Sequence, residues 1–261
     1  MDASLPKCEL CGKPLRRMIE IKGHVYCEQH GNGPRCDACG LPLLEGKALP
    51  DKRVLCHHCA GRVVLELGDA RKIYERAQRD VEKLTGIVLG ELPPLELVGR
   101  DRMPSAQQGL AVEDVQERGY YRQEVKTDTY ADEKGRVVRT DREVKETIYI
   151  LYAITPDELL CTSGHELTHA LQARFLPKIH ADAPLWLKEG TCQYVAASIA
   201  RRHHFADELA SIEQSPHPAY GRGYRYLKRR FGKDNWSGLL AWLHELDPTT
   251  LPAELPPDQT P

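Results

Sequence analysis

Two matched sets of paired cysteines near the N-terminus constrain the fold of this chain more than any other feature. Seven of the nine cysteines precede residue 60. The segment Cys8-Glu-Leu-Cys11-Gly-Lys-Pro-Leu15 recurs 28 residues later as Cys36-Asp-Ala-Cys39-Gly-Leu-Pro-Leu43. An odd number of cysteines with two-residue spacing is typical of metal sites in a reducing compartment, and disulfide frameworks have other patterns. The N-terminal part therefore predicts a small module that is stabilised by metal ions.

The second halves of the repeat identify the ligands. Val25-Tyr-Cys27-Glu-Gln-His30 aligns with Val54-Leu-Cys56-His-His-Cys59 if one residue is inserted. His24 stands where the other copy has Arg53, which cannot bind zinc. Two closed sites of the structural type follow. Their predicted ligands are Cys8, Cys11, Cys27 and His30 in the first site, and Cys36, Cys39, Cys56 and Cys59 in the second.

The module is too small to form a sufficient core, so zinc should provide most of its folding free energy. Its role is open between a folding or docking unit and a surface that recognises a protein partner. The formal net charge of the whole chain is −2. The module has few arginines and aromatics, so we expect no nucleic-acid partner.

A second metal motif, His165-Glu166-Leu-Thr-His169, lies in the C-terminal half. Histidines four residues apart share one face of a helix, so both imidazoles can reach one ion. A further helix is expected to begin at Asp182-Ala-Pro184 and to carry Glu189 as the third ligand. Three protein ligands and one open position are typical of catalytic zinc. The alternative is a polar helix whose histidines bind neighbouring side chains.

The rest of the chain predicts an α+β fold. Apolar spacing indicates an amphipathic helix over 62–84 and helices over 206–214 and 235–245. Strands are expected at 95–98, 120–126, 136–140 and 148–154, with a turn at 132–135. The last of these strands is apolar and could be an edge strand that pairs with a substrate or a buried core strand. The predicted domains are 1–61, 62–246 and a disordered proline-rich tail, 247–261.

Three motifs in this order resemble one protein family. They are the cysteine module, the pair His165-Glu-Leu-Thr-His169-Ala and Glu189-Gly-Thr-Cys-Gln193, and Pro218-Ala-Tyr-Gly-Arg-Gly-Tyr224. Over residues 6–232 the chain resembles the plant organ-size-regulating LIM peptidases, which are ubiquitin-activated zinc peptidases, and their shorter prokaryotic relatives. The resemblance implies a LIM-like module with two zinc ions, followed by a gluzincin-like peptidase domain with one catalytic zinc.

The chain also departs from related patterns. The plant proteins carry ubiquitin-interacting motifs ahead of the LIM region, whereas the first cysteine pair here begins at Cys8, so we do not expect control by ubiquitin. Many gluzincins have an aspartate where this chain has Gln193, whose amide oxygen could accept an imidazole N–H. The segment with which gluzincin aminopeptidases hold a substrate amine is not found in the sequence, so nothing favours exopeptidase action.

The expected reaction is zinc-assisted hydrolysis of peptide bonds in a protein or peptide. Glu166 would take a proton from the attacking water and return it to the leaving amine. Tyr220 is the first candidate to stabilise the oxyanion, with His217 and Tyr224 as alternatives; a packing role for Tyr220 is equally consistent. Cys161 and Cys192 lie in apolar helical segments and are expected to be core residues.

Two other function classes compete with the peptidase. One is a non-catalytic adaptor whose peptidase domain is vestigial, and the other is a nucleic-acid-bound regulator, which the charge balance disfavours. No apolar stretch approaches the roughly 18 residues that span a membrane. The N-terminus lacks a basic and then apolar signal pattern. We therefore expect a cytoplasmic protein without membrane association.

Overall fold

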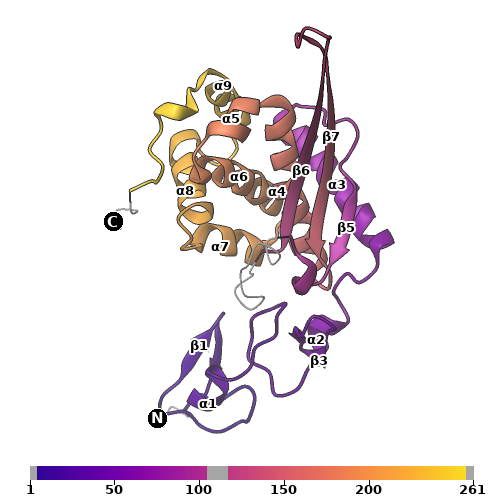
Figure 1. Ribbon diagram of the computed structural model, residues 1–261. Coiled ribbons are helices and arrows are strands. Elements are labelled where there is room, and N and C mark those ends of the chain that lie inside the picture. The colour runs from indigo at the N-terminus through magenta and orange to yellow at the C-terminus, as the bar shows by residue number, and fades with distance from the viewer. Residues whose placement is uncertain (1–4, 105–116, 257–261) are drawn as a thin grey trace. The chain divides into compact units, whose positions relative to one another are not determined.

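The computed structural model describes residues 5–104 and 117–256, which belong to two units (Figure 1). The first unit extends to Leu65 and includes Ala153–Thr155, and the second comprises the rest. Val64 donates its backbone N–H to the carbonyl of Ile154 at 2.9 Å, which explains why a distant segment belongs to the first unit. The first unit thus ends four residues after the predicted boundary at residue 61, and sequence spacing gave no sign of the added segment.

The first unit repeats one small motif twice. β1 (Ile19–Ile21) and β2 (His24–Tyr26) form an antiparallel hairpin that leads into α1 (Glu28–Gly31). β3 (Lys47–Ala48) and β4 (Val54–Leu55) lead in the same way into α2 (His57–Ala60). After each first cysteine pair, a glycine with positive φ, Gly12 at 69° and Gly40 at 73°, closes the turn. The internal sequence repeat is thus also a structural repeat.

A three-stranded sheet forms one side of the second unit. β7 (Val137–Leu151) lies between β5 (Leu95–Val98), which is parallel to it, and β6 (Gly119–Ala131), which is antiparallel. The strands predicted at 136–140 and 148–154 are one continuous strand that ends at Leu151. Ile148 and Ile150 are fully buried. The apolar segment is therefore a core strand. Among the described strands β5 and β6 are the two edges of this sheet, and β6 is the edge that contacts α4.

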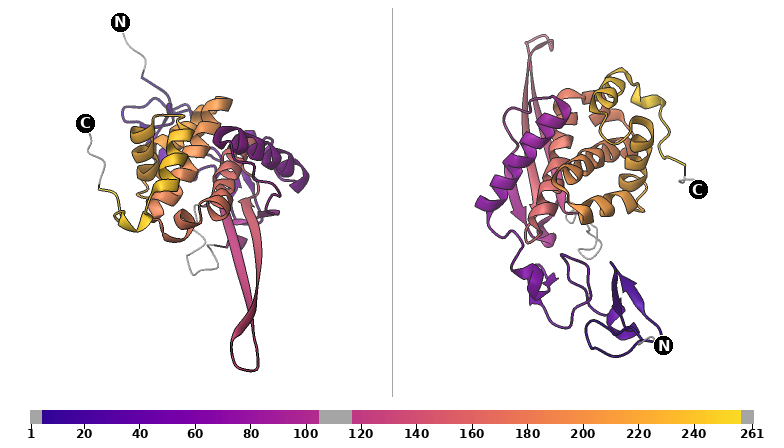
Figure 2. Two further views of the ribbon diagram at one scale, coloured as in Figure 1. Left: turned by 90° about the horizontal axis from the view of Figure 1, so that it is seen from above. Right: turned by 180° about the vertical axis from the view of Figure 1, so that it is seen from behind.

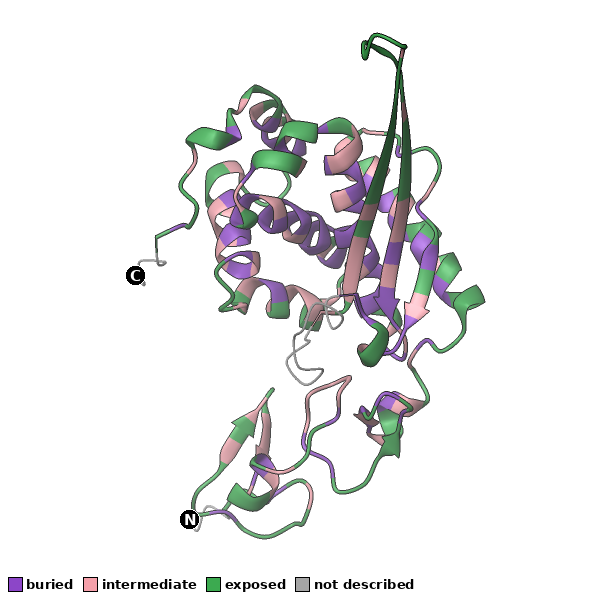
Figure 3. Ribbon diagram, viewed as in Figure 1, coloured by how far each residue is buried: buried purple, intermediate pink, exposed green. Residues whose placement is uncertain are grey.

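Helices cover the sheet on one side (Figure 2). In chain order they are α3 (Leu67–Thr85), α4 (Pro156–Phe175), α5 (Pro177–Asp182), α6 (Leu185–His203), α7 (Ala206–Gln214), α8 (Tyr220–Phe231) and α9 (Trp236–Glu245), with the short 3₁₀ helices η1 (Arg100–Arg102) and η4 (Pro248–Thr250). α4 and α6 are buried along nearly their whole length (Figure 3). The two helices that carry the second metal motif therefore form the centre of this unit, which has the expected mixed α+β character.

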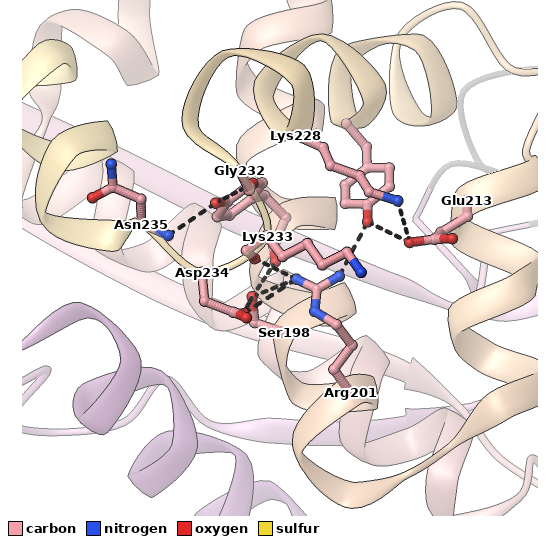
Figure 4. A network of polar contacts seen from close by, with 10 residues as sticks. Ser198, Arg201, Glu213, Lys228, Gly232, Lys233, Asp234 and Asn235 are labelled. Carbon is pink, nitrogen blue, oxygen red and sulfur yellow. Dashed lines mark hydrogen bonds and ion pairs between the residues drawn. The ribbon is translucent and has the colours of Figure 1, made fainter.

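Glycines let α8 pack closely on α6. A Cβ on Gly190 of α6 would lie 2.7 Å from the carbonyl carbon of Gly223 in α8, and one on Gly223 would lie 2.2 Å from the carbonyl oxygen of Trp186. A polar network fixes the far end of the same pair (Figure 4). There, Arg201 of α6 donates to the Tyr224 hydroxyl at 3.1 Å and to the Lys233 carbonyl at 2.5 Å. The position of α8 relative to α6 is thus set at both ends.

The proline-rich tail packs on the second unit over residues 247–256. Trp186 Nε1 donates to the Pro252 carbonyl at 2.9 Å, and Arg222 donates to the Leu255 carbonyl at 2.9 Å. Leu255 is 9% exposed. The expectation of a disordered tail is therefore wrong for this part, because its backbone carbonyls accept hydrogen bonds from Trp186 and Arg222; residues 257–261 lie outside the described residues. None of the described helices is long and apolar enough to cross a membrane.

Candidate metal centres and catalytic site

The first predicted zinc site is assembled in the structure. Ligand atoms of Cys8, Cys11, Cys27 and His30 lie within 4.8 Å of one another. Nδ1 of His30 is 3.4 Å from Sγ of both Cys8 and Cys27. Tetrahedral zinc with S and N ligands at about 2.3 and 2.1 Å requires a separation of about 3.6 Å between them. His24 instead lies 2.7 Å from the Glu9 carboxylate, in agreement with its exclusion from the ligands.

The environment of Cys8 favours a thiolate. Burial would raise the pKa of this thiol, but the backbone N–H of Cys27, the His30 side chain and further N–H groups lower it to about 5. Backbone donors that point at sulfur stabilise the charged form, which is the form that binds metal. The donor set of this site therefore suits a zinc ion.

The second predicted site also comes together. Ligand atoms of Cys36, Cys39, Cys56 and Cys59 lie within 4.8 Å of one another. Sγ of Cys36 accepts the backbone N–H of Cys56 at 3.2 Å. Burial, and then the neighbouring sulfurs, raise the pKa of Cys59. A divalent cation removes this mutual repulsion, since thiolates that share an ion are no longer unpaired charges. Four sulfur ligands at this spacing fit zinc.

The three predicted ligands of the second metal motif converge between α4 and α6. Nε2 of His165 lies 3.1 Å from Oε2 of Glu189, and Nε2 of His169 lies 3.4 Å from the same oxygen. Tetrahedral ligands at about 2.05 Å from zinc are about 3.3 Å apart, so these separations match two edges of one zinc tetrahedron. His165 and Glu189 are 7% and 8% exposed. The helical spacing in each motif and the packing of α4 on α6 produce this arrangement.

Charges within this cluster stabilise one another. Burial opposes ionisation of Glu189, yet His169 and His165 lower its pKa strongly. Burial also opposes a charged His169, but Cys192 and Glu189 raise its pKa well above the usual value. A buried carboxylate beside two imidazoles is stable only when a positive charge accompanies it. A metal cation or a shared proton can supply that charge at this point.

Glu166 lies beside the cluster, against strand β6. It is 5% exposed, and burial is the main cause of its raised pKa, which His165 and His169 partly offset. A Cβ on Gly119 would lie only 2.5 Å from Oε1 of Glu166 and 2.7 Å from Cγ2 of Thr162. Because Gly119 has no side chain, the Glu166 carboxylate has room to lie against β6.

The Nδ1 atom of His169 has a neighbour that the sequence analysis assigned to the core. Sγ of the buried Cys192 lies 3.5 Å from it, and no hydrogen bond between described residues joins Gln193 to either histidine. Cys192, and not the expected Gln193, is therefore the observed neighbour of the His169 imidazole. His165, His169 and Cys192 also form a group that could hold a metal. We favour Glu189 as the third ligand, because it faces Nε2 of both histidines, whereas the thiol faces Nδ1.

The three candidates for the oxyanion donor lie in different surroundings. The Tyr220 ring stacks on His165 with centroids 5.8 Å apart and planes 16° apart. His217 contacts the Tyr220 ring at 4.8 Å, and its Nδ1 accepts the backbone N–H of Ala219 at 3.2 Å. The Tyr224 hydroxyl is bound between Arg201 and Glu213 in a fully buried position. Tyr220 is therefore at the site, His217 positions the start of α8, and Tyr224 is structural.

Two further residues reach the site from β6 and the segment before it. The Tyr121 ring stacks on His169 at 6.3 Å, and its hydroxyl donates to Glu146 at 2.6 Å. One carboxylate oxygen of Glu117 is buried and has no hydrogen-bond partner, and its charge contributes to the raised pKa of Glu166 and of Tyr220. Sequence reasoning missed both, because no motif spacing connects them to the histidines some 45 residues later.

Comparison of the chain with protein-family models, with curated proteins and with solved structures found no match.

Proposed function

We propose that this protein is a zinc-dependent peptidase related to the LIM peptidases whose motifs it resembles. The observation that supports this most is the convergence of His165, His169 and Glu189 at the spacing of zinc ligands, with Glu166 beside them. A structural zinc site would not need a further buried carboxylate beside its ligands. This residue set is what zinc-assisted hydrolysis requires.

Zinc at this centre would supply a Lewis acid that polarises the scissile carbonyl and activates water. The protein's own residues do the rest. Glu166 accepts a proton from the attacking water and passes it to the leaving amine, and its raised pKa suits a group that must both take and release a proton near neutrality. Gly119 of β6 leaves room for its carboxylate to do so.

Tyr220 donates a hydrogen bond to the developing oxyanion in this proposal. Burial and the neighbouring carboxylates raise its pKa, so the phenol stays protonated and can act as a donor at neutral pH. One such donor contributes about 3 kcal/mol to the transition state. The edge position of β6 beside α4 suits it to pair with an extended polypeptide substrate.

The two N-terminal sites are proposed to hold structural zinc, which gives three zinc ions per chain. Their ligands must stay reduced, and this is consistent with a cytoplasmic location. The LIM-like module would then act as a folding unit or as a surface for a protein partner. We propose no role for ubiquitin, nucleic acid or a membrane.

The direct test is Glu166→Gln. The full chain is loaded with zinc and incubated with casein and with a peptide library, with and without a chelator. We expect the variant to keep its zinc, measured by elemental analysis, and to lose cleavage. Glu75→Gln, an exposed glutamate on α3, removes the same charge far from the site and should leave cleavage unchanged.

Undiminished cleavage by the Glu166 variant would refute the mechanism. If the native chain holds all three zinc ions and cleaves neither casein nor any library peptide, the adaptor function is supported instead.

A further inference from the structure

The hairpin of β6 and β7 continues far beyond the helices that cover its base (Figures 1 and 2). Every residue of β6 from Glu124 to Ala131 is exposed, and β5 pairs with β7 only from Ile148 to Leu151. We call the part formed by residues 124–131 and 137–145 the outer ribbon. A two-stranded ribbon with both faces in water is marginally stable by itself. Such a long one therefore calls for a functional explanation.

One face of the outer ribbon is charged. Residues directly opposite in an antiparallel pair project to the same face, so the register defines both faces. The pairs on this face are Glu124 with Lys145, Lys126 with Glu143, Asp128 with Asp141 and Tyr130 with Arg139. Ion pairs connect neighbours along it, such as Lys126 with Asp128 at 3.0 Å and Arg139 with Asp141 at 2.7 Å. These charges favour exposure of this face to water.

The other face is almost uncharged and rich in β-branched residues. Its pairs are Val125 with Val144, Thr127 with Arg142, Thr129 with Thr140 and Ala131 with Val137. Val125 is 45% exposed, Val144 44% and Val137 64%. Arg142 is the one charged residue among these pairs. Exposed apolar and β-branched residues that gather on one side of an element, with most of the charges on the other, mark an interaction surface.

The uncharged face is continuous with the wall of the candidate catalytic site. Gly119, Tyr121, Gln123 and Val125 alternate along β6 on this same face. Gly119 lies against Glu166, and Tyr121 stacks on His169. Glu146, opposite Gln123 on this face, is bound by Arg174 of α4, so a chain that lies on Val125 reaches the metal ligands along the exposed edge of β6.

We propose that the uncharged face of the outer ribbon is a docking surface for the polypeptide substrate, outside the residues that enter the catalytic site. This inference rests on the proposed peptidase function. It assigns the surface to an apolar or β-branched segment of the protein that is being cleaved, because a polymer can lie on the face and enter the site at the same time. Substrate selection by this enzyme then depends on a segment remote from the cleaved bond.

The distance between Tyr121 and Val125 determines how long a substrate must be to contact the docking surface. Val125 lies four residues beyond Tyr121, about 14 Å away at about 3.4 Å per residue. The whole face from Tyr121 to Ala131 extends for about 34 Å on the same basis. A hexapeptide with three residues, about 10 Å, on each side of the cleaved bond stops short of Val125. A protein substrate does not.

The test uses the full zinc-loaded chain and two substrates, β-casein and a fluorogenic hexapeptide taken from a casein cleavage site. The variant Val125→Lys/Val144→Glu removes the apolar pair while opposite charges keep the cross-strand contact favourable. The matched control, Lys126→Glu/Glu143→Lys, exchanges the neighbouring pair on the charged face. Circular dichroism checks that both variants fold.

In the variant Val125→Lys/Val144→Glu we expect KM for casein to rise about tenfold, because the contacts of two half-buried valines with the substrate are lost. For the hexapeptide, which does not reach these valines, kcat/KM should stay within about twofold of the native value. The control should change neither. An equal loss for both substrates, or no loss for casein, overturns the proposal. A concentration-dependent dimer that the valine variant abolishes would also overturn it, because the face would then bind a second copy.

A binding measurement separates this inference from the proposed function. In the Glu166→Gln background, the affinity for labelled β-casein is measured by fluorescence anisotropy with and without the valine substitutions. Weaker binding of the valine variant supports the docking surface even if the native chain cleaves nothing, in which case only the peptidase proposal fails. Equal binding by both overturns the docking surface even if the native chain is an active peptidase.

Discussion

Gly119→Ala should separate the position of the catalytic carboxylate from the binding of zinc. The added methyl group would lie 2.5 Å from Oε1 of Glu166, whereas ordinary contact begins at about 3.4 Å. The carboxylate must therefore shift by about 0.9 Å. A displacement of about 1 Å at a reacting group reduces the rate on the order of 100-fold, which corresponds to about 2.7 kcal/mol.

The same change should cost some stability and leave the fold intact. The closest atom is Oε1 of Glu166, but Cγ2 of Thr162 at 2.7 Å and Cγ of Glu166 at 2.8 Å must also move; the φ of Gly119 is not in the left-handed region. We expect a loss of about 1–3 kcal/mol, as for other overpacked buried sites. Atoms of the proposed zinc ligands His165, His169 and Glu189 are not among the three nearest to the added methyl group, so the zinc content should stay at the native value.

The assay measures kcat on a casein-derived peptide, zinc by elemental analysis and the melting temperature. Gly68→Ala on α3 is the matched control, because a Cβ there meets nothing within 4 Å, and it should retain native activity. Activity of the Gly119 variant within about threefold of native would refute the idea that the position of Glu166 controls the reaction. A loss of zinc would show that the methyl group acts through the metal centre instead.

Three further changes test the site and its support. Glu189→Ala should remove one zinc ion per chain and Cys192→Ala none, measured by elemental analysis; the opposite result would make the thiol the third ligand. Tyr220→Phe should lower kcat about 100-fold with zinc retained, as for other oxyanion donors, and an unchanged kcat would leave the ring a packing role. Burial opposes charge on Glu146, but Arg174 and Tyr121 lower its pKa below 4.5. Its contribution to stability is therefore complete above pH 4.5 and is lost as the pH falls through its lower folded pKa. In thermal melts, Glu146→Gln should reduce the loss of stability at acid pH. An unchanged loss would show that protonation of Glu146 does not cause it.

Sequence periodicity predicted those elements that are determined locally. α7 and β5 have the bounds that apolar spacing indicated, 206–214 and 95–98. The long strand β7 was divided into two in the prediction, because its charged middle, Asp141–Lys145, lacks the apolar alternation of a half-buried strand. That stretch lies in the outer ribbon, where neither face is covered. Its pairing with β6 forms the strand, and no local propensity indicates such a partner.

In the candidate site, too, helical spacing predicts some of the residues and only tertiary packing determines the others. The spacing of His165, His169 and Glu189 follows from helical geometry, so a single sequence suffices to group them. Cys192 and Gln193 are three and four residues after Glu189, and either can lie on the metal side of α6. Only the packing of α6 on α4 determines that the thiol meets Nδ1 of His169.

The missing side chains of three glycines bring the separate parts of the site together. Gly119 allows β6 to approach Glu166, while Gly190 and Gly223 allow α8 to approach α6 closely enough for Tyr220 to stack on His165. A glycine within a helix costs about 1 kcal/mol relative to alanine, so the chain gives up helix stability at the α6–α8 contact. Because a Cβ at Gly190 would meet backbone atoms of α8, this contact is much stiffer than the one at Gly119. Helices α6 and α8 are therefore held as one rigid pair, while the position of Glu166 depends on the edge strand β6, which also carries the proposed docking face. In the proposed mechanism, a substrate that engages β6 therefore acts on Glu166 without disturbing His165, His169 and Glu189.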